Sequence, residues 1–104
     1  MKRVAFTLKL KPGCLAEYRR RHDEIWPELA ALIRASGISD FSIFHDAATG
    51  TLLCVQDRAD DAAAEAMRDH PIALRWAAQM SAFLEVGEDG RPARTFLEPV
   101  FHLE

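Results

Sequence analysis

The spacing of apolar residues changes several times along this chain, and the order of the changes limits the fold more than any other feature. From Val4 to Leu10 the large apolar residues stand at every second position, the pattern of a half-buried β-strand. From Leu15 to about Ser36 they recur every third or fourth position, the pattern of one face of an α-helix, and Gly37 ends it. The chain therefore begins with a strand and a long helix.

Proline at position 27 interrupts this helical pattern. A proline inside a helix lacks the N–H that would bond to the preceding turn, and its ring clashes with the carbonyl four residues earlier. That carbonyl belongs to Asp23, so we expect a kink or a brief break near Asp23.

The second half of the chain repeats the change from strand to helix. Two short runs, Phe41–His45 and Thr51–Val55, flank a polar segment with a glycine, the arrangement of a β-hairpin. Asp60 can cap a helix over 61–69, and Pro71 separates that helix from a second helical segment over 72–84.

A loop over 85–94 and a last strand over 95–103 complete the predicted order β-α-β-β-α-β. This order predicts an α+β fold of the ferredoxin-like type, with an antiparallel sheet and helices on one face. A length of 104 residues suits a single domain, 1–104.

The face of the sheet without helices also needs cover. In the last strand Phe96 and Val100 alternate with Leu97 and Phe101, so neither side of the strand is plainly polar. We therefore expect this face to be buried against a second copy, which gives a homodimer of the dimeric α/β barrel type.

Charge and cysteine usage exclude several classes of partner. The net charge is −3, and the basic run Arg19–Arg21 lacks interleaved aromatics, so nucleic acid is not expected. Cys14 and Cys54 lack metal-ligand spacing and predict free thiols in a reducing compartment. The N-terminal segment is too short and too often interrupted for a signal sequence or a membrane span. We expect a cytoplasmic protein that does not bind membranes.

Tyr18, His22 and Trp26 follow one another at intervals of four and share one face of the first predicted helix. An imidazole suits proton transfer near neutral pH, and a polar pair on an apolar face costs stability unless it is hydrogen-bonded or used. Spacing alone leaves a second interpretation open, a histidine at the edge of the core held by a carbonyl or by Glu17 or Asp23.

Trp76, on the last helical segment, has two interpretations of similar weight, a core anchor and a platform for a ligand. Arg75 beside it is expected to be solvated. His45, His70 and His102 have no carboxylate at fixed spacing, so we expect packing or interface roles and no metal site.

The segment EYRRRHDEIWPEL, residues 17–29, resembles the signature EYxxRHxxIWPEL of the L-rhamnose mutarotase family. The pair Arg75-Trp76 and the ending Val100–Leu103 match other landmarks of that family, and the resemblance spans the chain. It implies a homodimer with a ferredoxin-like fold that interconverts the α and β anomers of L-rhamnose. The implied enzyme is an isomerase of the aldose 1-epimerase type that uses neither a metal nor an organic cofactor.

The same resemblance implies roles for single residues. His22 takes the position of the family's proton donor, Tyr18 that of a substrate-binding tyrosine, and Trp76 that of the first of two adjacent tryptophans at the sugar site. Two positions depart from the pattern, because Phe41 replaces a substrate-contacting tyrosine and Ala77 replaces the second tryptophan. These departures extend the candidate substrates to other 6-deoxy or unsubstituted sugars.

Our mechanistic hypothesis assigns two proton transfers. Protonated His22 donates to the ring oxygen, while Tyr18 or an ordered water relays the anomeric hydroxyl proton to a carboxylate. Trp26 and Trp76 meet the apolar face of the sugar. Two alternatives share the scaffold, a cofactor-free oxygenase or haem-handling protein and a non-catalytic sugar-binding dimeric module.

Overall fold

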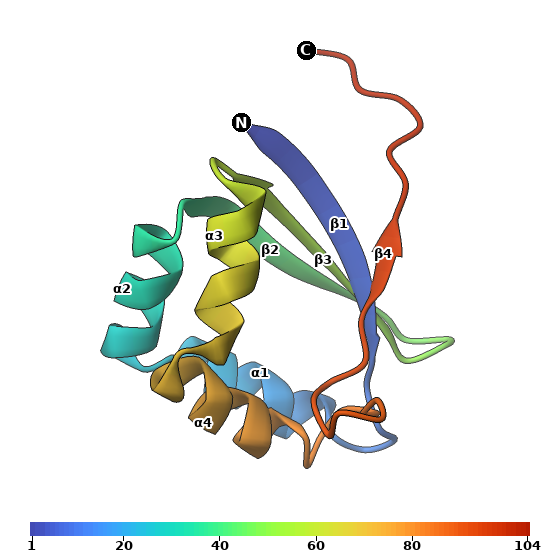
Figure 1. Ribbon diagram of the computed structural model, residues 1–104. Coiled ribbons are helices and arrows are strands. Elements are labelled where there is room, and N and C mark those ends of the chain that lie inside the picture. Colours follow the sequence, from blue (N-terminus) through green and yellow to red (C-terminus); the bar gives the residue numbers. More distant parts are fainter.

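A computed structural model describes all residues of the chain, 1–104, as a four-stranded antiparallel sheet with helices on one face (Figure 1). The elements in chain order are β1 (Lys2–Lys9), α1 (Leu15–Asp23), α2 (Pro27–Ala35), β2 (Ile38–Asp46), β3 (Thr51–Arg58), α3 (Asp61–Ala66), the 3-10 turn η1 (Met67–Asp69), α4 (Pro71–Met80) and β4 (Thr95–Leu97). The strands lie in the order β2-β3-β1-β4. This order confirms the predicted ferredoxin-like α+β fold. None of the helices is long and apolar enough to cross a membrane.

Strand β1 lies at the centre of the sheet and fixes which residues face the helices. Phe6 pairs with Cys54 of β3 on one side and with Phe96 of β4 on the other. Because side chains alternate between the two faces of a strand, these three residues point toward the helices. Val4 and Phe6 are buried there, as the period-two pattern predicts.

The break at Pro27 is larger than a kink. Helix α1 ends at Asp23, residues 24–26 leave the helical path, and α2 begins at Pro27. Proline is favoured at the first position of a helix, where its missing N–H has no partner to lose. The long helix expected from the sequence is therefore two helices that run in different directions (Figure 1).

The hairpin and the capped helix are confirmed. Strands β2 and β3 pair directly across the turn, with a bulge near Asp40, a non-glycine residue with φ of 47°. The carboxylate of Asp60 accepts hydrogen bonds from the backbone N–H groups of Ala62 and Ala63 and so caps α3. Helix α4 ends at Met80, four residues before the predicted end.

The last predicted strand is wrong beyond Leu97. Strand β4 covers only Thr95–Leu97, and the chain then runs on without a partner strand to its end (Figure 1). Pro99 lacks the N–H needed to continue a ladder, which explains why pairing stops there. Val100 and Phe101 are 95% and 82% exposed, so the alternation seen in the sequence is not used within one chain.

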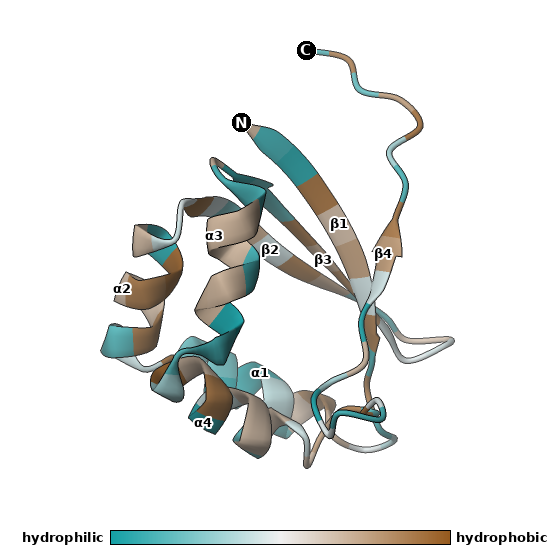
Figure 2. Cartoon of the chain, in the orientation of Figure 1, coloured by the Kyte–Doolittle hydropathy of each residue, from teal (hydrophilic) through white to brown (hydrophobic).

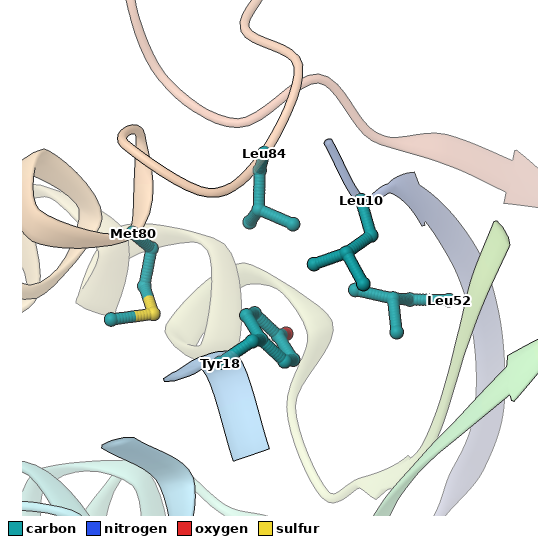
Figure 3. Close-up of a cluster of buried hydrophobic side chains, with 5 residues drawn as sticks. All are labelled: Leu10, Tyr18, Leu52, Met80 and Leu84. Carbon is teal, nitrogen blue, oxygen red and sulfur yellow. The ribbon is translucent and has the colours of Figure 1, made fainter. Parts of the chain in front are cut away.

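The core is small, because only 13 of the 104 residues are buried. One buried cluster joins α1, α4 and the sheet and consists of Leu10, Tyr18, Leu52, Met80 and Leu84 (Figure 3). A second cluster lies between the central strands and consists of Val4, Phe6 and Cys54. Much of the remaining space between the sheet and the helices is a cavity.

Candidate active site

The cavity has a volume of about 770 Å³ and lies between the helices and the sheet, with a mostly apolar lining. Five of the six site residues predicted from the sequence line it, namely Tyr18, His22, Phe41, Trp76 and Ala77. A largely apolar cavity with a few convergent polar groups is the usual form of a small-molecule site. The residues singled out by spacing and by resemblance are therefore brought together in space.

His22 lies in the last turn of α1, with its ring 4.2 Å from that of Tyr18 between centroids. Its Nδ1 is 2.8 Å from the carbonyl oxygen of Tyr18. A carbonyl only accepts hydrogen bonds, so in the neutral ring Nδ1 carries the proton and Nε2 keeps its lone pair. A carbonyl therefore positions the histidine, as the second interpretation expected, and no hydrogen bond to the protein occupies Nε2.

Burial lowers the pKa of His22 below its ordinary value of 6.5, and the hydrogen bond from Nδ1 to the Tyr18 carbonyl only partly offsets this effect. Burial therefore favours the neutral form of the imidazole. This geometry favours a resting histidine that accepts a proton at Nε2, in place of the protonated form expected from the sequence.

Tyr18 is only 5% exposed and belongs to the buried cluster around Leu10 and Leu52 (Figure 3). Burial raises the pKa of its phenol, so the hydroxyl remains protonated at any physiological pH. The hydroxyl forms no hydrogen bond to the protein and is not fully enclosed. It is therefore a free donor beside His22, on the wall of the cavity.

Trp76 stands edge-on to two aromatic rings. Its centroid is 5.3 Å from that of His22 at an angle of 80°, and 5.2 Å from that of Trp26 at 83°. Trp26, the sixth residue predicted for the site, is not part of the cavity lining. It lies at the break between α1 and α2, behind Trp76, where edge-to-face contact fixes the Trp76 ring. We call Tyr18, His22 and Trp76 the aromatic end of the cavity.

Phe41 and Ala77, the two residues expected to depart from the family pattern, both line the cavity. Phe41 lies in β2 next to the bulge and is 40% exposed. Ala77 follows Trp76 on α4 and leaves a gap where a larger side chain would fill the wall. Their positions explain how both changes can alter substrate fit without touching His22.

Three of the arginines that line the cavity come from the second half of the chain and were not among the site residues predicted from the sequence. Arg68 comes from η1, and Arg91 and Arg94 come from the segment before β4. We call these residues the arginine end of the cavity. No periodicity or motif marks them, because they meet only through contacts between distant segments.

The remaining histidines have separate positions. His45 lines the cavity from β2, while the Nδ1 of His70 accepts a hydrogen bond from the N–H of Ile72 and caps α4. His102 lies in the exposed C-terminal segment. No group of three or more His, Cys, Asp or Glu side chains is arranged to hold a metal ion.

Proteins of known family resemble this chain over almost its whole length. A family model described as L-rhamnose mutarotase matches residues 3–103. A protein named L-rhamnose mutarotase from Jannaschia sp. (strain CCS1) is 48% identical and covers 99% of both chains. One of the same name from Brucella anthropi is 46% identical over 97% of this chain and 95% of its own.

Solved structures fall into two groups. The crystal structure of L-rhamnose mutarotase FA22100 from Formosa agariphila superposes with a TM-score of 0.89 at 36% identity, covering 100% of both chains. A putative antibiotic biosynthesis monooxygenase from Nitrosomonas europaea superposes with a TM-score of 0.64 at 12% identity, covering 91% of this chain and 84% of its own. The second likeness shows a shared fold alone.

Proposed function

This chain belongs to the L-rhamnose mutarotase family, and on that premise we propose that it interconverts the α and β anomers of L-rhamnose or a closely related sugar. Such an enzyme is an isomerase of the aldose 1-epimerase type. The observation that carries the proposal is the His22 imidazole, tied at Nδ1 to a backbone carbonyl and free at Nε2 in a cavity lined by aromatic rings.

Ring opening needs a base for the anomeric hydroxyl and an acid for the ring oxygen. Neutral His22 accepts the hydroxyl proton at Nε2 while the bond from C1 to the ring oxygen breaks, which gives the aldehyde. The imidazolium then returns that proton to the ring oxygen. Because both oxygens are bonded to C1 in the closed sugar, one imidazole can serve both in turn. Rotation about the C1–C2 bond and the reverse steps give either anomer.

The relay expected from the sequence, through Tyr18 or an ordered water to a carboxylate, remains an alternative second route. Asp23 and Asp40 are the carboxylates that line the cavity and are its candidates. In either route the Tyr18 hydroxyl donates a hydrogen bond to a sugar oxygen, since its raised pKa prevents it from acting as a base near neutral pH.

Trp76 provides the wall for the apolar side of the sugar. Aromatic rings favour C–H surfaces and methyl groups, and the Trp76 ring is held by edge-to-face contacts with His22 and Trp26. Trp26 therefore acts as a positioning residue. Phe41 and Ala77 set the shape of the rest of the pocket and so contribute to the choice of sugar.

The homodimer is a further part of the proposal. The face of the sheet without helices carries Ala5, Phe44, Leu53, Val55 and Leu97, by alternation with the residues that face the helices. Phe44 is 59% exposed and Leu97 is 46% exposed, and Figure 2 shows hydrophobic residues in β4 and in the segment after it. A second copy of the chain would cover this apolar face.

Sedimentation equilibrium tests the dimer. We expect the wild type to sediment as a dimer and Leu53→Arg to sediment as a monomer, because a charge cannot be buried without a partner. Ala78→Arg, on the exposed side of α4, is the matched control and should remain dimeric. A monomeric wild type would contradict the proposal.

The location of the protein is also a proposal. Cys14 and Cys54 are both free thiols, as expected from the sequence. Free thiols suit a reducing compartment, and we propose the cytoplasm. Cell fractionation tests this, and recovery of the protein outside the cytoplasm would contradict it.

The activity is tested by NMR saturation transfer between the two anomeric signals of L-rhamnose, with L-fucose, L-mannose and L-lyxose as a panel. We expect the protein to raise the rate of anomer exchange above the rate in buffer. The sugar with the largest increase identifies the preferred substrate of the panel. Binding without faster exchange would favour the non-catalytic module. A Soret band after loading with haem, together with unchanged exchange, would favour the haem-handling alternative.

A further inference from the structure

The arginine end gives the cavity a cationic wall that anomer exchange of a neutral sugar does not need. Arg68, Arg91 and Arg94 line the same cavity as His22 and Trp76. Their side chains are 29%, 30% and 17% exposed, so their guanidinium groups are partly removed from bulk water. Positive groups in this environment attract anions more strongly than groups on an open surface.

Two of the three arginines are held in place by carboxylates. Arg94 donates two hydrogen bonds to Glu65, of 2.8 and 3.1 Å, and its guanidinium lies 4.8 Å from the centre of the Phe96 ring. Arg91 donates a hydrogen bond of 2.9 Å to Asp69. Each of these carboxylates is thus paired with an arginine, and the pairs hold the guanidinium groups of Arg91 and Arg94 in place.

Arg68 has no such partner. Its nearest carboxylate oxygen is Oε1 of Glu65 at 3.8 Å, an oxygen that already accepts from Arg94, and no hydrogen bond is formed. The other oxygen of Glu65 accepts from the buried guanidinium of Arg58 at 2.9 Å. Arg68 therefore has five N–H donors that no carboxylate of the protein uses.

The charges around Arg68 do not balance. Five cations, on Lys2, Arg58, Arg68, Arg91 and Arg94, face four carboxylates, on Asp61, Glu65, Asp69 and Asp89. Burial lowers the pKa of Arg68, and the neighbouring charge of Arg94 lowers it further. An anion beside Arg68 would relieve this crowding of positive charge.

The wall of α4 leaves room for a ligand to reach this end. Ala73 and Ala77 line the cavity on the same face of α4 as Trp76, and both have small side chains. The segment that carries Arg91 lies beside this helix, because Arg91 binds Asp69 before its start and Gly90 contacts Ser81 after its end. A sugar seated on Trp76 therefore has open space along α4.

We propose that the arginine end is a subsite for a negatively charged substituent of the sugar, a carboxylate or a phosphate, with Arg68 as its ligand and the charges of Arg91 and Arg94 behind it. A planar guanidinium with unused donors matches the paired oxygens of either group. The inference rests on the proposed mutarotase activity and extends its substrate class to sugars that carry an anionic group away from C1.

The test compares sugars that differ only at C6. L-Mannose, L-mannuronate and L-mannose 6-phosphate share the ring configuration of L-rhamnose, and kcat/KM for anomer exchange is measured on each by saturation transfer. We expect kcat/KM on one anionic sugar to exceed that on L-mannose by at least about tenfold, the usual effect of one charge-assisted hydrogen bond. The carboxylate and the phosphate are separate arms, and the larger value identifies the group.

The Arg68→Met variant should reduce the ratio of anionic to neutral kcat/KM by about tenfold, and Arg68→Lys should retain part of it. The matched control is Arg20→Met on the exposed side of α1, which should leave the ratio unchanged. Added NaCl should raise KM for the wild type on the anionic sugar and not on L-mannose, a readout that needs no variant.

Equal kcat/KM on all three sugars, or a ratio that Arg68→Met does not change, would overturn the subsite. In both cases exchange of L-mannose or L-rhamnose would still support the mutarotase. Absence of exchange with every sugar would overturn the mutarotase itself, so the two failures are distinguishable.

Discussion

The two ends of the cavity are built in different ways. At the aromatic end, Tyr18 and His22 are one helical turn apart, and the hydrogen bond that positions the imidazole closes within that turn. At the arginine end, Arg94 reaches Glu65 across 29 positions of the chain, and Arg91 reaches Asp69 across 22. The first arrangement depends on local backbone geometry, and the second depends on the completed tertiary fold.

Because of this difference, we expect the residues of the aromatic end to affect catalysis and the ion pairs of the arginine end to affect the stability of the fold. A histidine positioned within its own helix can be replaced without loss of a long-range contact. The carboxylate of Glu65 joins α3 to β3 and to the segment before β4 through Arg58 and Arg94, and it stabilises the fold even though it takes no part in proton transfer. Substitutions at the two ends should therefore affect different measurements.

The largest effect is expected from His22→Gln. The amide can still bond to the carbonyl of Tyr18 but cannot accept and return a proton, so the exchange rate of L-rhamnose should fall by about 10²- to 10⁴-fold. Circular dichroism and the denaturant midpoint should change little. His102→Gln, in the exposed C-terminal segment, is the control, and a loss of activity there or full activity in His22→Gln would remove the distinction between the ends.

The second largest effect is expected on the free energy of unfolding. It appears in the comparison of two glutamates, Glu65 and Glu17, each of which forms hydrogen bonds with two arginines. Glu65→Gln weakens the pairing of Arg58, whose side chain is only 4% exposed, so we expect a loss of about 1–3 kcal/mol in the free energy of unfolding. Glu17→Gln removes the pairs with Arg20 and Arg21 on the exposed side of α1 and should have a much smaller effect. Urea unfolding of both variants at pH 7 measures the difference.

The stability that Glu65 contributes should also depend on pH, and the direction of the change can be predicted. Arg94 and Arg58 hold the pKa of Glu65 at about 2, below its ordinary value of 4.5. A carboxyl whose pKa is lowered in the folded state stabilises that state above its ordinary pKa, and the contribution is lost as the pH falls from about 4.5 toward 2. The gap in stability between wild type and Glu65→Gln should narrow over that range. A gap that stays constant would mean that the charge of Glu65 is not what stabilises this end.

The smallest effect is expected where the pocket departs from its family. Phe41→Tyr restores a hydroxyl and Ala77→Trp restores an aromatic wall, and each should raise kcat/KM on L-rhamnose by about two- to tenfold, the range of one hydrogen bond or one aromatic contact. Both changes lie in the cavity lining and leave His22 itself unchanged. Unchanged kinetics in both variants would mean that these positions do not select the sugar.

The fold and the pairing of Tyr18 with His22 could be predicted because their causes are local, whereas only the family resemblance assigned Trp76 to the same site. Alternation marks β1, the spacing of four marks Tyr18 and His22, and Pro27 marks the break, although the sequence did not show that the break would be complete. The last strand was overestimated because alternation continues after Pro99 while pairing does not. Alternation predicts an extended segment but does not supply a neighbouring strand.

The arginine end could not be predicted for a physical reason. Its members, Arg68, Arg91 and Arg94, come from η1 and the segment before β4, and no period connects them in the sequence with Glu65 of α3, which holds Arg94. The position of Trp26 was not predicted correctly either, because the helix that was expected to carry it ends before it. Helical spacing carried it along the face of Tyr18 and His22, but the break at Pro27 ends that helix first.

One pH titration tests whether neutral His22 accepts the proton at Nε2. The chemical shifts of the His22 imidazole and kcat/KM for L-rhamnose exchange are recorded on the same NMR samples. Because burial lowers the pKa of His22 below 6.5 and protonation removes the lone pair of Nε2, both curves should share one midpoint below pH 6.5. Activity should fall on the acid side of that midpoint. A rate that stays constant through the titration of His22, or that rises as His22 becomes protonated, would contradict the role of neutral His22 as the proton acceptor.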